Sequence, residues 1–159
     1  MMIVLLTGEV HSGKSTALLQ LMDKKQIFGL INPVDQQGKK YFLLASTPSA
    51  FPMESDDPAE SGVSVGKYRF SAGAFERANR ELIDEWKRAS GVFVFDEVGK
   101  LELREEGLFH AIQFILSNPN PKVKTLIFVV RDYLLESASE KFGWQNATVI
   151  YKEDVPLFA

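Results

Sequence analysis

A glycine-rich segment early in the chain carries a lysine and a hydroxyl side chain at the spacing of a phosphate-binding loop. It fits the pattern G-x-x-x-x-G-K-[ST] and reads Gly8-Glu9-Val10-His11-Ser12-Gly13-Lys14-Ser15. Its glycines let successive backbone N–H groups converge on phosphate oxygens, where the N-terminus of a following helix adds partial positive charge. Lys14 is expected to reach the β- and γ-phosphates of a nucleotide, and the Ser15 hydroxyl to take one position around Mg²⁺.

The surroundings of this segment are those that the motif requires. The apolar run 3–6 before it favours a strand, and residues 15–22 are compatible with a helix. A strand, a loop and a helix in this order make the match specific. The residues expected to bind nucleotide are therefore Gly8, Glu9, Val10, His11, Ser12, Gly13, Lys14, Ser15 and Thr16.

A second apolar run, at 92–95, ends in two adjacent acids, Asp96 and Glu97. Open α/β sheets bind ligands at the carboxyl ends of their strands, so Asp96 is expected to hold Mg²⁺ through a water, as a Walker-B aspartate does. Glu97 occupies the usual position of a base that orients a hydrolytic water, and we expect it to be catalytic. The alternative for both acids is a solvated pair at a strand end.

Hydrolysis of a nucleotide also needs positive charge against the γ-phosphate, which can raise the rate by about 10³–10⁵ when an arginine supplies it. Arg69 and Arg131 are the leading candidates, followed by Lys67. Strand alternation within 63–70 places Lys67 and Arg69 on one face, and Arg131 ends the apolar run 126–130. The alternative for each is an ordinary surface cation. Weaker candidates are Arg77, Arg80 and Arg104.

The composition is that of an ordinary globular protein and excludes several kinds of site. The 159 residues are 45% hydrophobic and 25% charged, which suits a single domain over residues 1–159. Without cysteine there are no disulfides, thiolate metal sites or cysteine nucleophiles. A formal net charge of −3 gives no electrostatic case for a nucleic acid or membrane partner, and no apolar stretch approaches the ~18 residues of a membrane span. We expect a cytoplasmic protein with neither partner; its oligomeric state stays open.

The pattern of apolar residues predicts an α/β fold, with a mostly parallel central sheet flanked by helices. Apolar residues recur at three- and four-residue spacing in 75–89 and in 108–116, which predicts two helices, the first capped by Ser71. Asp132 is expected to cap a third helix. Continuous apolar runs typical of strands buried on both faces lie at 3–6, 92–95, 126–130 and 148–151.

Two segments interrupt the alternation of predicted strands and helices. Residues 30–32 and 41–44 flank a turn at 35–38, which predicts a β-hairpin inserted after the first helix. Residues 47–64 are rich in proline, serine and acid, and predict a long irregular segment that is either a mobile loop or a lid over the site.

Three motifs together resemble one family. They are Thr7-Gly8 with Gly13-Lys14-Ser15, then Val65-Gly66-Lys67-Tyr68, then Asp96-Glu97-Val98-Gly99-Lys100-Leu101-Glu102-Leu103. In order and separation they look like the thermophilic and cancer-related nucleoside-triphosphatase family, which pairs a phosphate loop with a V-G-x-Y-like segment and a D-E-[IV]-G-x-[ML]-E-L block. The last motif is the specific one, because many families share a phosphate loop.

This resemblance implies a RecA-like P-loop fold and slow, Mg²⁺-dependent hydrolysis of the β–γ bond of ATP, GTP and other nucleoside triphosphates, with broad base tolerance. After the first helix the family has a glycine-rich hairpin beginning G-F-x-T with basic residues, and this chain departs from it with Gly29-Leu30-Ile31-Asn32-Pro33. The residues that match family positions are Gly8, Gly13, Lys14, Ser15 and Thr16 for phosphate and Mg²⁺, Asp96 and Glu97 in the Walker-B block, and Glu102 as the second acid of that block.

Three activities remain open on the sequence. The favoured one is hydrolysis by a water that Glu97 positions. In the second, a kinase transfers the γ-phosphate to an unknown small molecule or nucleotide, whose hydroxyl Glu97 would activate. The third is a nucleotide-dependent switch that binds a partner; against a GTPase switch, the guanine-recognition motif N-K-x-D does not occur in the chain.

Overall fold

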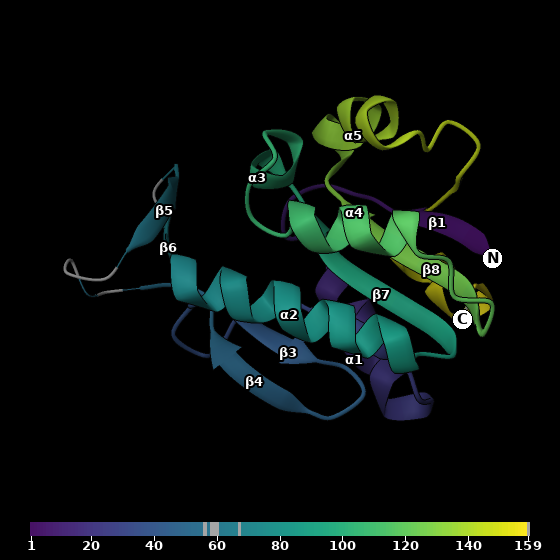
Figure 1. The fold of residues 1–159 in the computed structure, drawn as a ribbon, viewed down its shortest axis with the longest axis horizontal. Coiled ribbons are helices and arrows are strands. Elements are labelled where there is room, and N and C mark those ends of the chain that lie inside the picture. Colours follow the sequence, from purple (N-terminus) through teal and green to yellow (C-terminus); the bar gives the residue numbers. More distant parts are fainter. Residues whose placement is uncertain (56, 58–60, 67, 159) are drawn as a thin grey trace.

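A seven-stranded sheet forms the centre of the computed structural model (Figure 1), which describes residues 1–55, 57, 61–66 and 68–158. In the described chain its strands lie in the order β4-β3-β2-β7-β8-β1-β9. Their bounds are β1 (Met2–Leu6), β2 (Phe28–Ile31), β3 (Tyr41–Leu44), β4 (Ser49–Pro52), β7 (Gly91–Val98), β8 (Val123–Val130) and β9 (Thr148–Ile150). A separate antiparallel pair consists of β5 (Gly62–Val65) and β6 (Tyr68–Ser71).

Helices connect these strands and cover both faces of the sheet. α2 and α4 cross the face turned to the viewer in Figure 1, and α1 lies behind the sheet. The helices are α1 (Lys14–Lys24), α2 (Ala72–Arg88), α3 (Lys100–Leu103), α4 (Phe109–Ser117) and α5 (Leu135–Phe142), and the 3₁₀ turns are η1 (Asp132–Leu134) and η2 (Lys152–Leu157).

The direction of the strands confirms the α/β class and the mostly parallel sheet. β2, β7, β8, β1 and β9 pair in parallel, whereas β3 pairs antiparallel with β2 and β4 with β3. The predicted hairpin after the first helix is therefore confirmed, and its strands extend the central sheet. Because β8 lies between β1 and β7, the segments that follow these three strands leave the sheet side by side at one edge.

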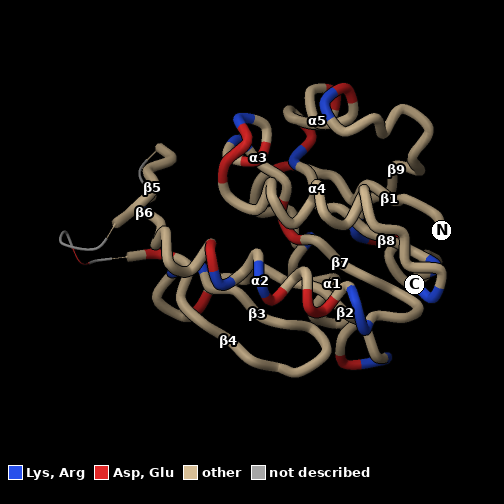
Figure 2. Tube along the Cα trace, viewed as in Figure 1, with Lys and Arg blue, Asp and Glu red and all other residues tan. Residues whose placement is uncertain are grey.

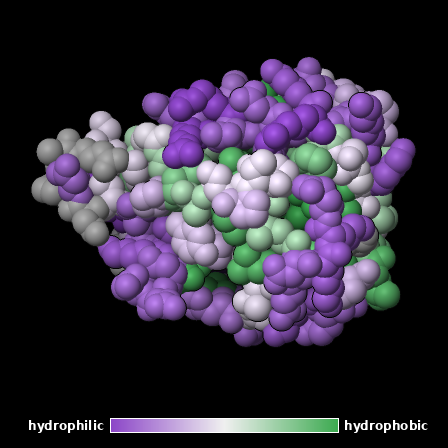
Figure 3. All heavy atoms as spheres, turned by 90° about the horizontal axis from the view of Figure 1, so that it is seen from below, coloured by the Kyte–Doolittle hydropathy of each residue, from purple (hydrophilic) through white to green (hydrophobic). Residues whose placement is uncertain are grey.

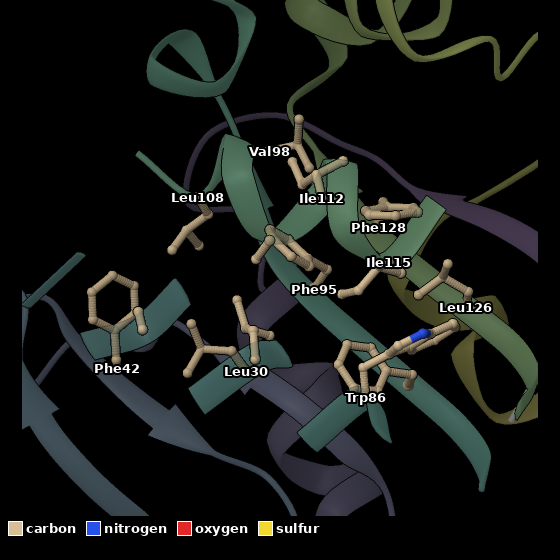
Figure 4. Close-up of a cluster of buried hydrophobic side chains, with 14 of the residues drawn as sticks. Leu30, Phe42, Trp86, Phe95, Val98, Leu108, Ile112, Ile115, Leu126 and Phe128 are labelled. Carbon is tan, nitrogen blue, oxygen red and sulfur yellow. The ribbon is translucent and has the colours of Figure 1, made fainter. Parts of the chain in front are cut away.

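Alternate residues of the central strands face opposite sides of the sheet, as the period of a strand requires. In β1, Leu5 belongs to one buried cluster and Val4 to the other; in β7, Phe95 and Val94 divide in the same way. Figure 4 shows the first cluster gathered between the sheet and α2 and α4, with Trp86 prominent in it. Two fully buried faces explain why the strand sequences are continuous apolar runs.

Helix α2 is amphipathic, and its ends are fixed as the sequence predicts. The Ser71 side chain accepts a hydrogen bond from Ala74 N at 3.2 Å and so caps the helix. Phe75, Leu82 and Trp86 are buried at helical spacing. Figure 2 shows basic and acidic residues intermixed along the same helix.

The face shown in Figure 3 is mostly hydrophilic, with hydrophobic patches across its middle. No helix of the described chain is both long and apolar enough to cross a membrane.

The prediction of an irregular segment over 47–64 was wrong in part. Ser49–Pro52 form β4, which pairs with β3 at the edge of the sheet, where a proline such as Pro52 is tolerated. Gly62–Val65 form β5. Residues 56 and 58–60 of the predicted segment lie outside the described residues.

Residues 63–70 do not form one continuous strand. A turn at Gly66, with φ +57°, separates β5 from β6. Lys67 itself lies outside the described residues. Asp132 does not cap the third helix, because Leu134 occupies that position in α5 and the Asp132 carboxylate accepts from the adjacent Tyr133 N.

Gly29→Ala tests the packing of β2 on β7. Gly29 has φ +106°, and a Cβ there would overlap the backbone of Val94. We expect the free energy of unfolding to fall by about 3 kcal/mol or more, because backbone atoms cannot move aside cheaply. Urea denaturation measures this loss. The control is Gly38→Ala, at φ +79° with no described atom within 4 Å of the new Cβ, which should lose only about 1–2 kcal/mol; equal losses would contradict the packing argument.

Candidate active site

The phosphate loop leaves β1 at the carboxyl edge of the sheet and is held by backbone contacts on two sides. Thr7 N donates to Ile150 O of β9 at 2.9 Å, and Asp132 N, just after β8, donates to Gly8 O at 3.1 Å. A Cβ on Gly8 would lie 2.8 Å from Ser12 Oγ, so the close approach of these residues requires glycine. The loop has the strand before it and the helix after it that its motif predicts.

Lys14 points back into this loop. Its Nζ donates to Glu9 O at 2.7 Å, to Ser12 Oγ at 3.2 Å and to Gly8 O at 3.3 Å. Burial lowers the pKa of Lys14, and the nearby Glu97 opposes that effect. The ammonium group is thus a buried donor within the loop, where phosphate oxygens would offer it stronger, charge-assisted hydrogen bonds.

Asp96 connects the end of β7 to the phosphate loop. Its Oδ2 accepts from Ser15 Oγ at 2.7 Å and from the backbone N of Asn32 at 3.1 Å. The pKa of this carboxyl is raised to about 6, first by burial and then by the neighbouring Glu97, while the two hydrogen bonds oppose the shift. A carboxylate beside a hydroxyl is the hard oxygen donor set that Mg²⁺ takes, and these two side chains fit a magnesium ion that also binds phosphate oxygens.

Glu97 lies between two cations. Its Oε2 is 3.4 Å from Arg131 Nε, and its Oε1 is 3.9 Å from Lys40 Nζ. The three side chains are only 13–24% exposed, so solvent screens their charges incompletely. Burial lowers the pKa of Arg131, but Glu97 and Tyr133 together outweigh this effect and the pKa is raised. An acid and two cations therefore stand together at the edge that carries the phosphate loop.

The structure brings Arg131 to this site but not Arg69. Arg131 follows β8, between the loop after β1 and the acids that end β7. The guanidinium of Arg69 instead donates to Asp57 O at 2.6 Å and lies against Gly62. Arg69 lines neither of the cavities beside Glu97.

Lys40 is a site residue that the sequence reasoning missed. It precedes β3 in the hairpin region, and its backbone bridges to Val34. The pairing of β2 with β7, and of β3 with β2, brings this residue to the carboxyl edge of the sheet, and no local sequence pattern encodes that pairing.

Two cavities meet at Glu97. The first, of about 310 Å³, is lined by loop residues 11–16 together with Asp96 and Glu97. The second, of about 200 Å³, lies on the side of α3 and β6. Both are lined by Asn32, Lys40, Glu97 and Arg131. Of the loop residues predicted to bind nucleotide, Gly8 and Glu9 line a third cavity of about 410 Å³, and Val10 is exposed.

Glu102, the second acid of the Walker-B block, is buried behind the site. Its Oε1 accepts from Gly99 N and its Oε2 from Leu108 N, both at 2.8 Å. Burial raises the pKa of Glu102 to about 7, against the effect of these hydrogen bonds. The Glu102 side chain thereby connects the residue before the short helix α3 to the segment after it, and it lines the second cavity.

A family model described as NTPase matches residues 3–153, a range that contains the phosphate loop, Asp96, Glu97 and Arg131. The chain belongs to the NTPase family. Membership assigns it the hydrolysis of nucleoside triphosphates and bears out the resemblance seen in its motifs. A comparison with curated protein sequences gave no significant match.

Two solved structures share the fold of this NTPase family chain. THEP1 from the hyperthermophile Aquifex aeolicus is 19% identical with a TM-score of 0.65, and the match covers 99% of both chains. A human cancer-related nucleoside triphosphatase is 21% identical with a TM-score of 0.65, over 98% of this chain and 94% of that one. The P-loop fold predicted from the motifs is thus confirmed along nearly the whole length.

Glu102→Gln tests the buried acid of the NTPase site. The folded carboxyl keeps its proton up to about pH 7, whereas the unfolded one ionises near 4.5, so the free energy of unfolding falls as the pH rises between these values. Glutamine does not titrate, so in Glu102→Gln the free energy of unfolding should fall less steeply with pH, by up to about 1.4 kcal/mol per pH unit. Urea denaturation across this range measures the slope. Glu106→Gln, at a 48% exposed side chain, is the control; an unchanged slope in Glu102→Gln would contradict the raised pKa.

Proposed function

We propose that this chain hydrolyses the β–γ bond of nucleoside triphosphates, with Mg²⁺, to a nucleoside diphosphate and phosphate. One observation carries the proposal: Glu97 borders the first cavity between Arg131 and Lys40, at 3.4 and 3.9 Å. Residues 11–16 of the phosphate loop line the same cavity. An acid that can orient water thus faces the place where the loop would hold a γ-phosphate.

Binding in this proposal uses the loop and the start of α1. Backbone N–H groups and the helix N-terminus bind the phosphates, and Lys14 exchanges its carbonyl partners for β- and γ-phosphate oxygens. Ser15 and Asp96 would hold Mg²⁺, which when bound neutralises charge on those oxygens.

The chemical step places a water between Glu97 and the γ-phosphorus. The water oxygen bonds to phosphorus as the bond to the β-phosphate oxygen breaks, and Glu97 accepts the proton of the water. Negative charge spreads over the transferred phosphoryl oxygens in the transition state, where Arg131 and Lys40 stabilise it. These two cations are already fixed by Glu97, so little reorganisation accompanies the reaction.

Broad base tolerance is supported by the third cavity, beside β9. Tyr151 and Lys152 follow that strand and line the cavity with Gly8 and Asp132, and Tyr151 is 54% exposed. Stacking on an aromatic ring is available to every nucleobase and does not select among them. A nucleoside that lies there would be held without readout of its base edges.

Lys14→Ala and Glu97→Gln test the proposal together. With Mg²⁺ and each common nucleoside triphosphate, the wild type should release phosphate steadily, and Lys14→Ala should release none because the counter-charge to the phosphates is lost. Glu97→Gln should bind nucleotide normally while kcat falls by at least ~10², the scale of a general base. Phosphate release near the wild-type rate in Lys14→Ala would refute the site. A parallel loss of affinity and kcat in Glu97→Gln would make Glu97 structural.

Arg131→Ala and Arg69→Ala form a matched pair of arginine deletions. Removal of the Arg131 guanidinium, 3.4 Å from Glu97, should lower kcat by at least ~10² with a smaller change in nucleotide affinity. Arg69→Ala removes a contact to Asp57 O outside the cavities, and we expect kcat within about twofold of the wild type. Steady-state phosphate release measures both. A larger loss in Arg69→Ala would overturn the assignment of Arg131.

A further inference from the structure

The second cavity is larger than a hydrolytic water requires and opens onto Glu97. At about 200 Å³ it has several times the ≈30 Å³ share of one liquid water, yet it lies below the usual range of about 300–1,000 Å³ for drug-sized ligands. Its wall continues from Glu97 and Arg131, which also border the first cavity. A molecule in the second cavity would thus lie beside the proposed position of the γ-phosphate.

A continuous row of aromatic rings forms one wall of this cavity. Phe42 of β3 contacts Phe75 of α2 edge to face at 5.5 Å between ring centroids, Phe75 contacts Phe70 of β6 in the same way at 5.9 Å, and Phe70 stacks on Tyr68 at 5.7 Å. Met53 adds a flexible apolar side chain to the lining. Such a wall favours the body of an aromatic or apolar molecule.

The other end of the cavity is polar and includes an unsatisfied acceptor. Asn32 is 9% exposed, and its Oδ1 receives no hydrogen bond from the described residues. Buried acceptors without a donor are rare and costly. Asn32 borders both cavities, as do Lys40 and Glu97, so the polar end of the second cavity adjoins the position proposed for the γ-phosphate.

We propose that the second cavity binds a small uncharged alcohol with an aromatic or apolar body, which accepts the γ-phosphoryl group in place of water. This inference rests on the proposed function, because it uses the same nucleotide position and Glu97. The apolar wall holds the body, and the hydroxyl donates its single hydrogen bond to the Glu97 carboxylate, which lines the same cavity. An anionic acceptor is disfavoured, since Lys40 and Arg131 already flank a carboxylate and serve the γ-phosphate.

The transfer step is balanced without any further reactant. The alcohol oxygen bonds to the γ-phosphorus, and its proton passes to the Glu97 carboxylate. The bond between the γ-phosphorus and the β-phosphate oxygen breaks, and its electron pair stays with the nucleoside diphosphate. The products are a phosphomonoester of the alcohol and the diphosphate, and hydrolysis is the same reaction with water in the acceptor position.

The first experiment tests occupancy of the cavity with benzyl alcohol as the probe. In protein labelled at its methionine methyl groups with ¹³C, titration should shift the Met53 signal. Met22 of α1 belongs to the other core cluster and should not shift. Val65→Trp adds bulk at a residue of the cavity lining and should abolish the shift. Val63→Trp, on the same face of β5 but outside the lining, is the matched control and should retain it.

The second experiment tests transfer. Protein, Mg²⁺, ATP and benzyl alcohol are followed by ³¹P NMR, and benzyl phosphate should form while phosphate falls below ADP by the same amount. Val65→Trp should lower the yield of benzyl phosphate relative to phosphate by at least ~10-fold, because the added ring occupies the cavity that positions the alcohol.

Each outcome decides the proposal. A Met53 shift together with benzyl phosphate supports it. Equal amounts of ADP and phosphate despite a Met53 shift would overturn the acceptor role, and the lack of any Met53 shift would overturn the site. In either case, phosphate release that Lys14→Ala abolishes leaves the proposed hydrolysis standing. Benzyl phosphate without any phosphate release from the wild type would overturn the proposed hydrolysis alone, and the absence of both products would overturn both proposals.

Discussion

The hydrogen bond between Ser15 and Asp96 is the constraint on which the rest of the site depends. It joins side chains 81 residues apart, and Asp96 also accepts from the Asn32 backbone, so one buried carboxylate ties the start of α1, the end of β7 and the residue after β2. A charge buried this deeply costs free energy unless it is hydrogen-bonded. The three segments are therefore held in one arrangement, and the phosphate loop faces Glu97 because of it.

Strand order converts this arrangement into a charged site. Because β8 separates β1 from β7, the residue after β8, Arg131, stands between the loop and Glu97. Lys40 comes from the antiparallel extension of the sheet and lies near the other carboxylate oxygen of Glu97. Both cations are paired with Glu97, so its single negative charge offsets part of their positive charge in the folded protein. A triphosphate would add negative charge to an edge already supplied with three cations, counting Lys14.

The parts of the fold and of the site that depend on contiguous residues could be predicted from the sequence. The phosphate loop and the acids at 96 and 97 follow from contiguous motifs, and the strands buried on both faces follow from continuous apolar runs. The sequence did not predict β4, because an edge strand needs no long apolar run and tolerates proline. The sequence did not predict Lys40 and Asn32 as site residues for another reason. They reach the site only because β2 pairs with β7, a long-range contact that no local pattern encodes. The turn at Gly66, which separates β5 from β6, was likewise not predicted within the run 63–70.

Hydrolysis in ¹⁸O-labelled water tests the central claim most directly, namely that a water beside Glu97 attacks the γ-phosphorus. Mass spectrometry of the products of a single turnover locates the label. We predict one ¹⁸O atom in inorganic phosphate and none in the nucleoside diphosphate, because the bond between the γ-phosphorus and the β-phosphate oxygen breaks. Label in the diphosphate, or formation of a nucleoside monophosphate with pyrophosphate, would show attack at another phosphorus and contradict the arrangement of the site.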